Sequence, residues 1–338
     1  MRSSTVRVAV AWLGFATAAC SGGSSAHGTP TATMSRSFTT SPGQIVFVND
    51  PLAAGQHQQL YVERADGSGV RRLLTSTFDD VAPTISPDGA RVVFTRVDNP
   101  RPDRIFMVGV DGSGLHQIVP SGCPSVCGDA VEGHAWSPDG RQLVFTRAIY
   151  GDGSGSPTEV ELWISNADGT EARRVTRETR RAQDDFGGWS PDGSTLVFMH
   201  WVYGSPDHFE IATIRVDGGR MHRITPIGLD AADPGWSPDG GLIVFQSPPD
   251  PEAGVAQNIY TVHPDGSHLT LLTPHLGGVA TNHASWSPDG TQLLFSHAPS
   301  GPLGGDLFVM SRDGTGLHVL AVSSLNENAA FWGPSPPG

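Results

Sequence analysis

Trp189-Ser190-Pro191-Asp192-Gly193 is one of four identical copies of the motif that decides the fold of this chain; the others occupy residues 136–140, 236–240 and 286–290. Residues 85–89 carry the same turn with Ile85 in place of Trp, and shortened copies occupy residues 41–43 and 332–334. The prolines of these copies recur about every 45 to 53 residues, a period that predicts repeated supersecondary units.

Each repeat follows the motif with an apolar run that ends in Phe, a third short run, a second Asp-Gly pair and a fourth run. The six phenylalanines are Phe47, Phe94, Phe145, Phe198, Phe245 and Phe295. In the motif, Pro presets φ, Asp can accept local backbone hydrogen bonds, and Gly takes the positive φ of a tight hairpin. The runs are rich in Val, Ile, Phe and Thr, as β-strands are. Four strands in each of six repeats predict an all-β, six-bladed β-propeller with four-stranded antiparallel blades.

The two ends of the repeat region predict how the ring closes. Residues 44–74 supply the second, third and fourth strands of a first unit, whose own first strand is doubtful. Residues 329–332 supply an isolated first strand at the other end. We therefore expect the C-terminal strand to become the innermost strand of the first blade, with residues 34–41 as the alternative source.

The repeated motif followed by an apolar strand resembles the propeller repeat of TolB-type proteins, over roughly residues 44–334. The resemblance implies a β-propeller domain at residues 44–338. TolB proteins also carry an α/β domain ahead of the propeller, for which the preceding residues leave no room, so the resemblance implies the propeller alone. A shared fold does not define an activity or a partner.

The N-terminal segment predicts export. Residues 1–20 combine Arg2 and Arg7 with an apolar core at residues 8–19 that is too short for a stable membrane span. Small residues before Cys20, and Ser and Gly after it, resemble a bacterial lipoprotein signal, which implies lipidation of Cys20 and a lipid anchor at the cell envelope, on its periplasmic or cell-surface side. An ordinary secretory signal is the alternative. Residues 21–43 are a flexible Ser/Gly/Thr-rich linker with little apolar content.

Composition limits the class of partner. The chain has a formal net charge of −13, and its 21 basic residues are all Arg. This acidic balance argues against nucleic acid, since phosphate binding requires a basic surface. We expect a monomer that meets the membrane through its lipid anchor only.

Two cysteines remain if Cys20 is lipidated. Cys123 and Cys127 lie four residues apart in an irregular segment between two blades. In an oxidising compartment this even number predicts a short-loop disulfide. A metal site is the alternative, with Asp129, Glu132 and His134 as the nearby candidate ligands.

The two faces of a propeller are predicted to differ. The first-to-second and third-to-fourth turns are short and share one side, here called the tight-turn face. The second-to-third and blade-to-blade connections vary in length and share the other side, the variable face, where binding residues are expected. The variable connections are predicted at residues 97–103, 119–133, 148–159, 177–187, 201–209, 247–257 and 298–305. Candidate partner-binding residues there are Tyr150, Trp201, Tyr203 and Phe209, although each of them could instead pack on its own loop.

Polar residues also gather where the innermost strands begin, at the mouth of the central channel on the variable face. The principal candidates are Asp80, His134, Asp185, Asp233, His283 and Asn328; Asp79, Glu132, Asp184, Asp230, Asn282 and Asn326 accompany them. Such a ring could hold a divalent cation or an amine-bearing ligand. The alternative is that they are polar caps on strand ends in contact with channel water.

These observations favour a non-catalytic, envelope-tethered scaffold that binds a protein or a cell-wall component through the variable face and needs no cofactor. The alternatives are a divalent-cation-dependent propeller enzyme, lactonase- or lyase-like, and a sensor for a small ligand or glycan, both acting at the channel. No Gly-x-Ser-x-Gly elbow is present in the sequence to support a hydrolase triad. Convergence of several carboxylates and imidazoles on one point would favour an enzyme, and dispersal would favour a scaffold.

Overall fold

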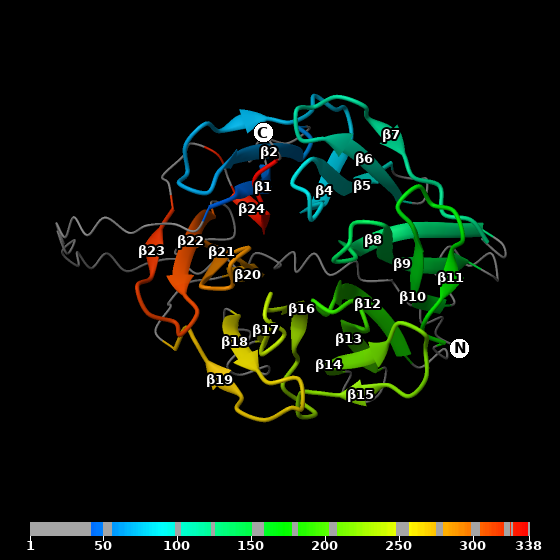
Figure 1. Ribbon diagram of the computed structural model, residues 1–338, viewed down its shortest axis with the longest axis vertical. Helices are drawn as coiled ribbons and strands as arrows, with labels where there is room; N and C mark the ends of the chain where they lie inside the picture. The colour runs from blue at the N-terminus through cyan, green and yellow to red at the C-terminus, as the bar shows by residue number, and fades with distance from the viewer. Residues whose placement is uncertain are drawn as a thin grey trace, which may run out of the picture.

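The computed structural model describes residues 42–49, 56–98, 103–122, 126–150, 159–177, 182–202, 208–247, 257–274, 280–298, 305–320, 325 and 327–336. Within these ranges the chain forms β-strands and no helix. The strands make six four-stranded antiparallel sheets around a central axis (Figure 1). The predicted six-bladed propeller is confirmed. No described residue belongs to a helix long and apolar enough to cross a membrane.

The blades are numbered from the N-terminus, and the strands of each are given from the axis outward. Blade 1 contains β24 (Glu327–Gly333), β1 (Gln44–Asn49), β2 (Gln59–Arg64) and β3 (Arg71–Arg72). Blade 2 contains β4 (Asp79–Ile85), β5 (Arg91–Val97), β6 (Arg104–Gly109) and β7 (His116–Gln117). Blade 3 contains β8 (Val126–Trp136), β9 (Gln142–Tyr150), β10 (Glu159–Asn166) and β11 (Arg173–Arg174).

The remaining blades have the same strand order. Blade 4 contains β12 (Ala182–Trp189), β13 (Thr195–Val202), β14 (His208–Arg215) and β15 (His222–Arg223). Blade 5 contains β16 (Ala232–Trp236), β17 (Ile243–Ser247), β18 (Asn258–Val262) and β19 (Thr270–Leu271). Blade 6 contains β20 (Ala280–Trp286), β21 (Gln292–Ala298), β22 (Asp306–Ser311) and β23 (His318–Val319).

Blade 1 takes its innermost strand from the C-terminal part of the chain, as predicted. β24 pairs antiparallel with β1, and Ile45 lies opposite Trp332. The side-chain amide of Gln44 donates to the carbonyl oxygens of Gly89 at 2.6 Å and Pro334 at 3.1 Å. Gln44 therefore connects the closing blade to the first turn of blade 2.

The Ser-Pro-Asp-Gly turn has a fixed set of internal hydrogen bonds. In blade 4, Ser190 Oγ donates to Asp192 Oδ1 at 2.6 Å and accepts from the backbone N–H of Thr195 at 3.0 Å. The N–H of Gly193 donates to the carbonyl of Ser190 at 2.9 Å, and Gly193 has a φ of 71°. The same serine–aspartate and serine–backbone bonds form at Ser86, Ser137, Ser237 and Ser287. The serine of the motif is thus a structural residue of the turn.

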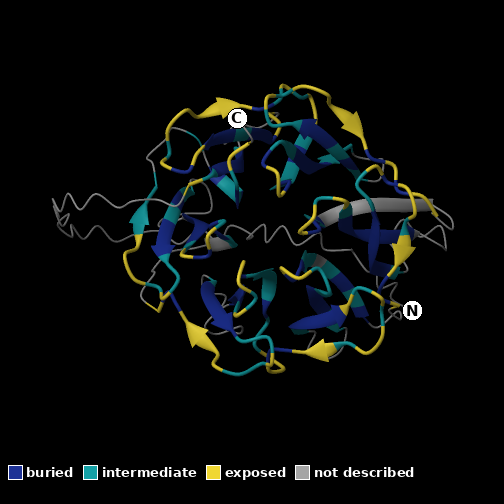
Figure 2. Ribbon diagram, in the orientation of Figure 1, coloured by how far each residue is buried: buried dark blue, intermediate teal, exposed yellow. Residues whose placement is uncertain are grey.

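Apolar residues fill the seams between neighbouring blades. All six repeated phenylalanines are fully buried. Between blades 2 and 3, for example, Trp136 and Phe145 pack with Val93 and Ile105. Each such side chain contributes about 1.5–3 kcal/mol on burial. Figure 2 shows the middle strands buried and the outermost strands mainly exposed, so the ring is held by packing of blade on blade.

Four predicted connections were too long. β9 continues to Tyr150, β8 begins at Val126, and β12 begins at Ala182. Trp201 and Phe209, both assigned to a loop, are opposite residues of paired strands, and their rings lie 5.1 Å apart. Cross-strand packing of this kind extends a ladder past the point where the apolar run ends.

Candidate functional site

The inner strands begin on the variable face, and all six of them bulge near the mouth of the channel. The register with the second strand shifts between Ala232 and Gly235 in blade 5 and between Asn282 and Ser285 in blade 6. At the bulges Asp233 has a φ of 50° and His283 a φ of 54°. Left-handed backbone at a non-glycine residue costs on the order of 1 kcal/mol. Contacts with Gln246 help to keep both residues in this conformation.

Asp233 and His283 form the one close pair among the principal candidates that the structure describes. His283 Nε2 lies 3.5 Å from Asp233 Oδ2, and the side-chain amide of Gln246 donates to the same oxygen at 2.5 Å. The Gln246 carbonyl oxygen accepts from the backbone N–H of His283 at 3.1 Å. Burial raises the pKa of Asp233, and the nearby His283 acts in the opposite direction. Gln246 therefore joins blades 5 and 6 through both candidates.

Asp80 and Asp184 are enclosed within their own blades. The side chains of both aspartates are fully buried. Asp80 accepts two hydrogen bonds from the Arg96 guanidinium, at 2.7 and 2.8 Å, and Asp184 lies 2.7 Å from His200 Nδ1. Burial raises the pKa of both aspartates, and their partners oppose that effect. Neither side chain is available to a ligand in the channel.

Three further candidates link neighbouring blades. His134 Nδ1 lies 3.3 Å from Thr84 Oγ1, and burial lowers the pKa of His134 to about 4, which keeps it neutral at pH 7. Asp185 accepts a hydrogen bond of 2.5 Å from Thr146 Oγ1. Asn328 accepts from Ser296 Oγ at 3.3 Å. Each of these residues, within its inner strand, is hydrogen-bonded to a side chain of a neighbouring blade.

Two of the accompanying polar residues also accept hydrogen bonds from the backbone. Asp79 accepts from the backbone N–H of Gln58 at 2.8 Å, and Asp230 accepts from that of Phe209 at 3.3 Å. The side chains of Glu132 and Asn282, and all of Asn326, lie outside the described residues. Among residues whose positions are described, no three His, Cys, Asp or Glu side chains lie close enough together to hold a metal ion. The described candidates are dispersed around the ring.

Sequence reasoning missed a polar layer inside the blades, near the variable face. In blade 4, buried Glu210 pairs with Arg223 at 2.8 Å, next to the Asp184–His200 pair. In blade 3, buried Arg147 donates to the carbonyl of Ser121 at 3.0 Å and stacks over Trp163 at 4.4 Å. The sequence held a signal for this layer. The residue two places after each repeated Phe is polar: Asn49, Arg96, Arg147, His200, Ser247 and His297.

The predicted partner-binding aromatics are partly described. Trp201 and Phe209 are half-buried at the variable ends of β13 and β14 and pack on each other. The connection that follows blade 4 runs beside them, because the N–H of Ala231 donates to the carbonyl of Phe209 at 3.2 Å. Ile227 in that connection is 70% exposed. The side chain of Tyr150 and all of Tyr203 lie outside the described residues.

The predicted covalent sites are not described either. Cys20 and Cys123 lie outside the described residues, and of Cys127 only the backbone, in β8, is placed. Lipidation of Cys20 and a disulfide between Cys123 and Cys127 therefore stay predictions.

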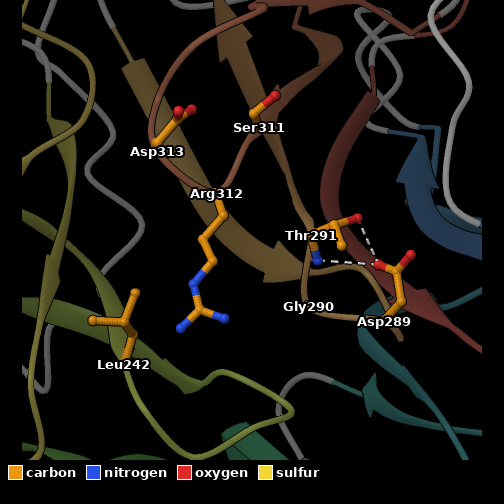
Figure 3. Close-up of a pocket in the computed structure, with 7 residues that line it drawn as sticks. All are labelled: Leu242, Asp289, Gly290, Thr291, Ser311, Arg312 and Asp313. Atoms are coloured by element: carbon orange, nitrogen blue, oxygen red, sulfur yellow. Dashed lines mark hydrogen bonds between the residues drawn. The ribbon is translucent and has the colours of Figure 1, made fainter.

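A shallow depression of about 570 Å³ lies on the tight-turn face (Figure 3). It is lined by Leu242, Asp289, Gly290, Thr291, Ser311, Arg312 and Asp313. Arg312 Nη1 lies 2.6 Å from Asp239 Oδ2 of blade 5, and the guanidinium packs over Trp286 at 5.4 Å. This arginine ties blades 5 and 6 together, so its charge is already matched.

The strand order, the ring closure and the repeated turn define a closed six-bladed β-propeller. Its repeats of about 45 to 53 residues have a length typical of propeller blades. Residues 125–336 match the model of the TolB beta propeller domain. That match covers more than half of the chain, which therefore belongs to the TolB beta propeller domain family.

Individual relatives agree with this assignment. A protein TolB homolog of Chlorobium luteolum is 29% identical over 165 residues, which are 49% of this chain and 33% of that protein. The match thus spans about a third of the relative's length. The crystal structure of TolB from Acinetobacter baumannii superposes with a TM-score of 0.66 at 20% identity, covering 87% of this chain and 67% of that one. A putative TolB from Agrobacterium tumefaciens gives 0.62 at 19% identity, covering 86% and 92%. At these identities the two structures show the fold alone.

Proposed function

We propose that this protein is a non-catalytic, envelope-tethered propeller scaffold that binds a protein or cell-wall partner through its variable face. The observation that carries the proposal is the dispersal of the described channel-mouth groups. Asp80 and Asp184 pair with Arg96 and His200 inside their own blades. His134, Asp185 and Asn328 form hydrogen bonds to neighbouring blades. An active site would need several such groups aimed at one reacting atom.

We propose that the contact surface lies at the junction of blades 4 and 5 on the variable face. The half-buried Trp201–Phe209 pair supplies a rigid aromatic anchor, and exposed Ile227 extends its apolar area. Anchors of this kind carry most of the binding energy in protein interfaces. Asp230 lies beside them, within a chain of net charge −13. This combination fits a partner segment that pairs an apolar side chain with basic residues.

Envelope tethering rests on the sequence. The apolar segment at residues 8–19, Cys20 and the linker at residues 21–43 support a propeller that lies outside the cytoplasm on a lipid anchor. Relatedness to TolB proteins supports an exported protein. Replacing Cys20 by Ser should release the protein from membrane fractions, and unchanged fractionation with no added mass at Cys20 would contradict the anchor.

Site-specific photocrosslinking tests the binding surface. A photoreactive amino acid at Ile227, on the variable face, should capture a discrete partner from envelope extracts. The same amino acid at Leu115, which is 42% exposed on a hairpin of the tight-turn face, is the matched control and should capture none. Capture from Leu115 alone would contradict the assignment of the face.

The enzyme alternative has its own test. The double variant Asp233→Asn, His283→Gln should leave photocapture unchanged if the pair only ties blades 5 and 6. A divalent-cation-dependent lyase or lactonase activity of the wild type that this variant abolishes would replace the scaffold proposal with the enzyme.

A further inference from the structure

The outer hairpin of blade 5, between β18 and β19 (yellow in Figure 1), departs from the repeat. It carries His263 before the turn and His268 after it. The place of His268 is held by glycine in blades 1, 2 and 6: Gly69, Gly114 and Gly316. All three glycines have a left-handed backbone, and His268 keeps that conformation with a φ of 57°. Glu171 of blade 3 holds the same place with a φ of 53°, so a left-handed residue that carries a side chain is not particular to blade 5. What sets this hairpin apart is the second histidine, His263, on the other side of the turn.

The two imidazoles are already neighbours. Their ring centroids lie 4.6 Å apart, with 31° between the ring planes. His268 is exposed and His263 half-buried, so both can turn about their side-chain bonds. Two imidazole nitrogens that bind one Zn²⁺ ion at 2.0–2.1 Å with tetrahedral geometry lie about 3.3 Å apart. Ring centroids 4.6 Å apart are compatible with that separation between one nitrogen of each ring.

A hydrogen-bonded chain fixes the tautomer of His268. Ser267 Oγ lies 2.6 Å from Asp265 Oδ1 and 2.9 Å from His268 Nδ1. The serine hydroxyl has one hydrogen, which it donates to the carboxylate, so its oxygen accepts the hydrogen of Nδ1. That arrangement leaves Nε2 of His268 unprotonated and pointing away from the chain of bonds. Histidine ligands of metals are oriented by this kind of supporting contact.

We propose that His263 and His268 form a site for a divalent transition-metal ion of the kind that prefers imidazole, such as Ni²⁺, Cu²⁺ or Zn²⁺. The two rings supply the protein ligands, and water completes the coordination shell. Asp265, on the same turn, contributes negative charge beside the ion.

The other hairpins contain built-in controls. The hairpins of blades 2 and 6 contain one histidine each, His116 and His318, which follow the glycines Gly114 and Gly316. Their Nδ1 atoms lie 2.7 Å from the carbonyl oxygens of Gly114 and Gly316. Each of these histidines offers a single ring, and a single ring binds such ions more weakly than two.

Titration of the full chain with Ni²⁺ alone, followed by calorimetry and by thermal melting, tests the site. His268→Gly and His263→Asn install residues found in other blades, and each should weaken the tightest Ni²⁺ site by at least about tenfold. His116→Arg should leave that site unchanged. Ni²⁺ should raise the melting temperature of the wild type but not of His268→Gly, which without metal should melt at or above the wild type because its backbone strain is relieved. The site is disproved if both variants titrate like the wild type, or if His116→Arg weakens binding equally.

Discussion

The tight-turn face and the variable face of this propeller are built on different rules. On the tight-turn face, one serine–aspartate hydrogen bond recurs in five blades, from Ser86 to Ser287. On the variable face, the polar partners differ in kind: arginine with aspartate in blade 2, histidine with aspartate in blade 4, and glutamine with aspartate and histidine across blades 5 and 6. The tight-turn face therefore repeats one local hydrogen-bond pattern, whereas on the variable face the hydrogen-bond partners differ from blade to blade.

This difference separates the part of the molecule that specifies the fold from the part free to specify a partner. A turn whose serine and aspartate bond within the turn itself can be copied from blade to blade. A strand end on the variable face must be satisfied by whatever lies beside it. Family membership therefore follows from the tight-turn face, and the proposed binding function is assigned to the other.

The largest effect is expected from opening the ring. Deleting residues 329–338 removes most of β24 and leaves β1 with an unpaired edge, which is prone to aggregation. We expect loss of soluble protein, measured by fractionation and by the melting of any soluble remainder. Removal of residues 337 and 338 alone is the control and should melt like the wild type. A soluble 1–328 protein with wild-type melting would place the closure elsewhere.

The next effect tests a departure from the repeat in blade 1. Glu63 is 3% exposed, and both of its carboxylate oxygens are buried with no hydrogen-bond partner among the described residues. The equivalent residues of the other blades are Val108, Ser165, Ile214, Val262 and Met310. The pKa of Glu63 is raised from 4.5 to about 8, mainly by burial and next by the negative charge of Glu327.

Glu63 should therefore make stability fall as the pH rises. Between pH 4.5 and about 8 the folded protein holds a proton that the unfolded chain releases, so the free energy of unfolding decreases through this window, in total by roughly 5 kcal/mol. Glu63→Met should melt higher than the wild type at pH 8.5 and lose most of this pH dependence. Glu63→Gln is the control, because glutamine keeps the size and shape of the side chain but does not titrate. A Met variant with an unchanged pH profile would contradict the assignment.

A smaller effect is expected within one turn. Ser190→Ala removes two hydrogen bonds at a side chain that is 5% exposed and should cost about 1–3 kcal/mol of unfolding free energy. Ser194→Ala, in the same turn, removes an exposed bond to Asp192 and should change the free energy by less than about 0.5 kcal/mol. Denaturant unfolding measures both. Equal losses would show that the buried serine has no special role.

The sequence predicted the ring, the closing strand and the buried phenylalanines because each depends on local chemistry repeated at a steady period. It placed Asp80 and Asp184 at the channel mouth but could not show that Arg96 and His200 bury them, since register across a sheet pairs residues 16 positions apart. It likewise ended β13 too early, because Trp201 and Phe209 stabilise each other across the strands rather than along them.

The most direct test compares the two faces in one assay, using the partner captured through Ile227. Phe209→Ala, on the variable face, should weaken partner binding by about 1–3 kcal/mol and change the melting temperature little, because Phe209 is only half-buried. Ser190→Ala, on the tight-turn face, should lower the melting temperature and leave the affinity of the folded protein unchanged. The account would be contradicted if Phe209→Ala bound like the wild type while Ser190→Ala, still folded, lost the partner.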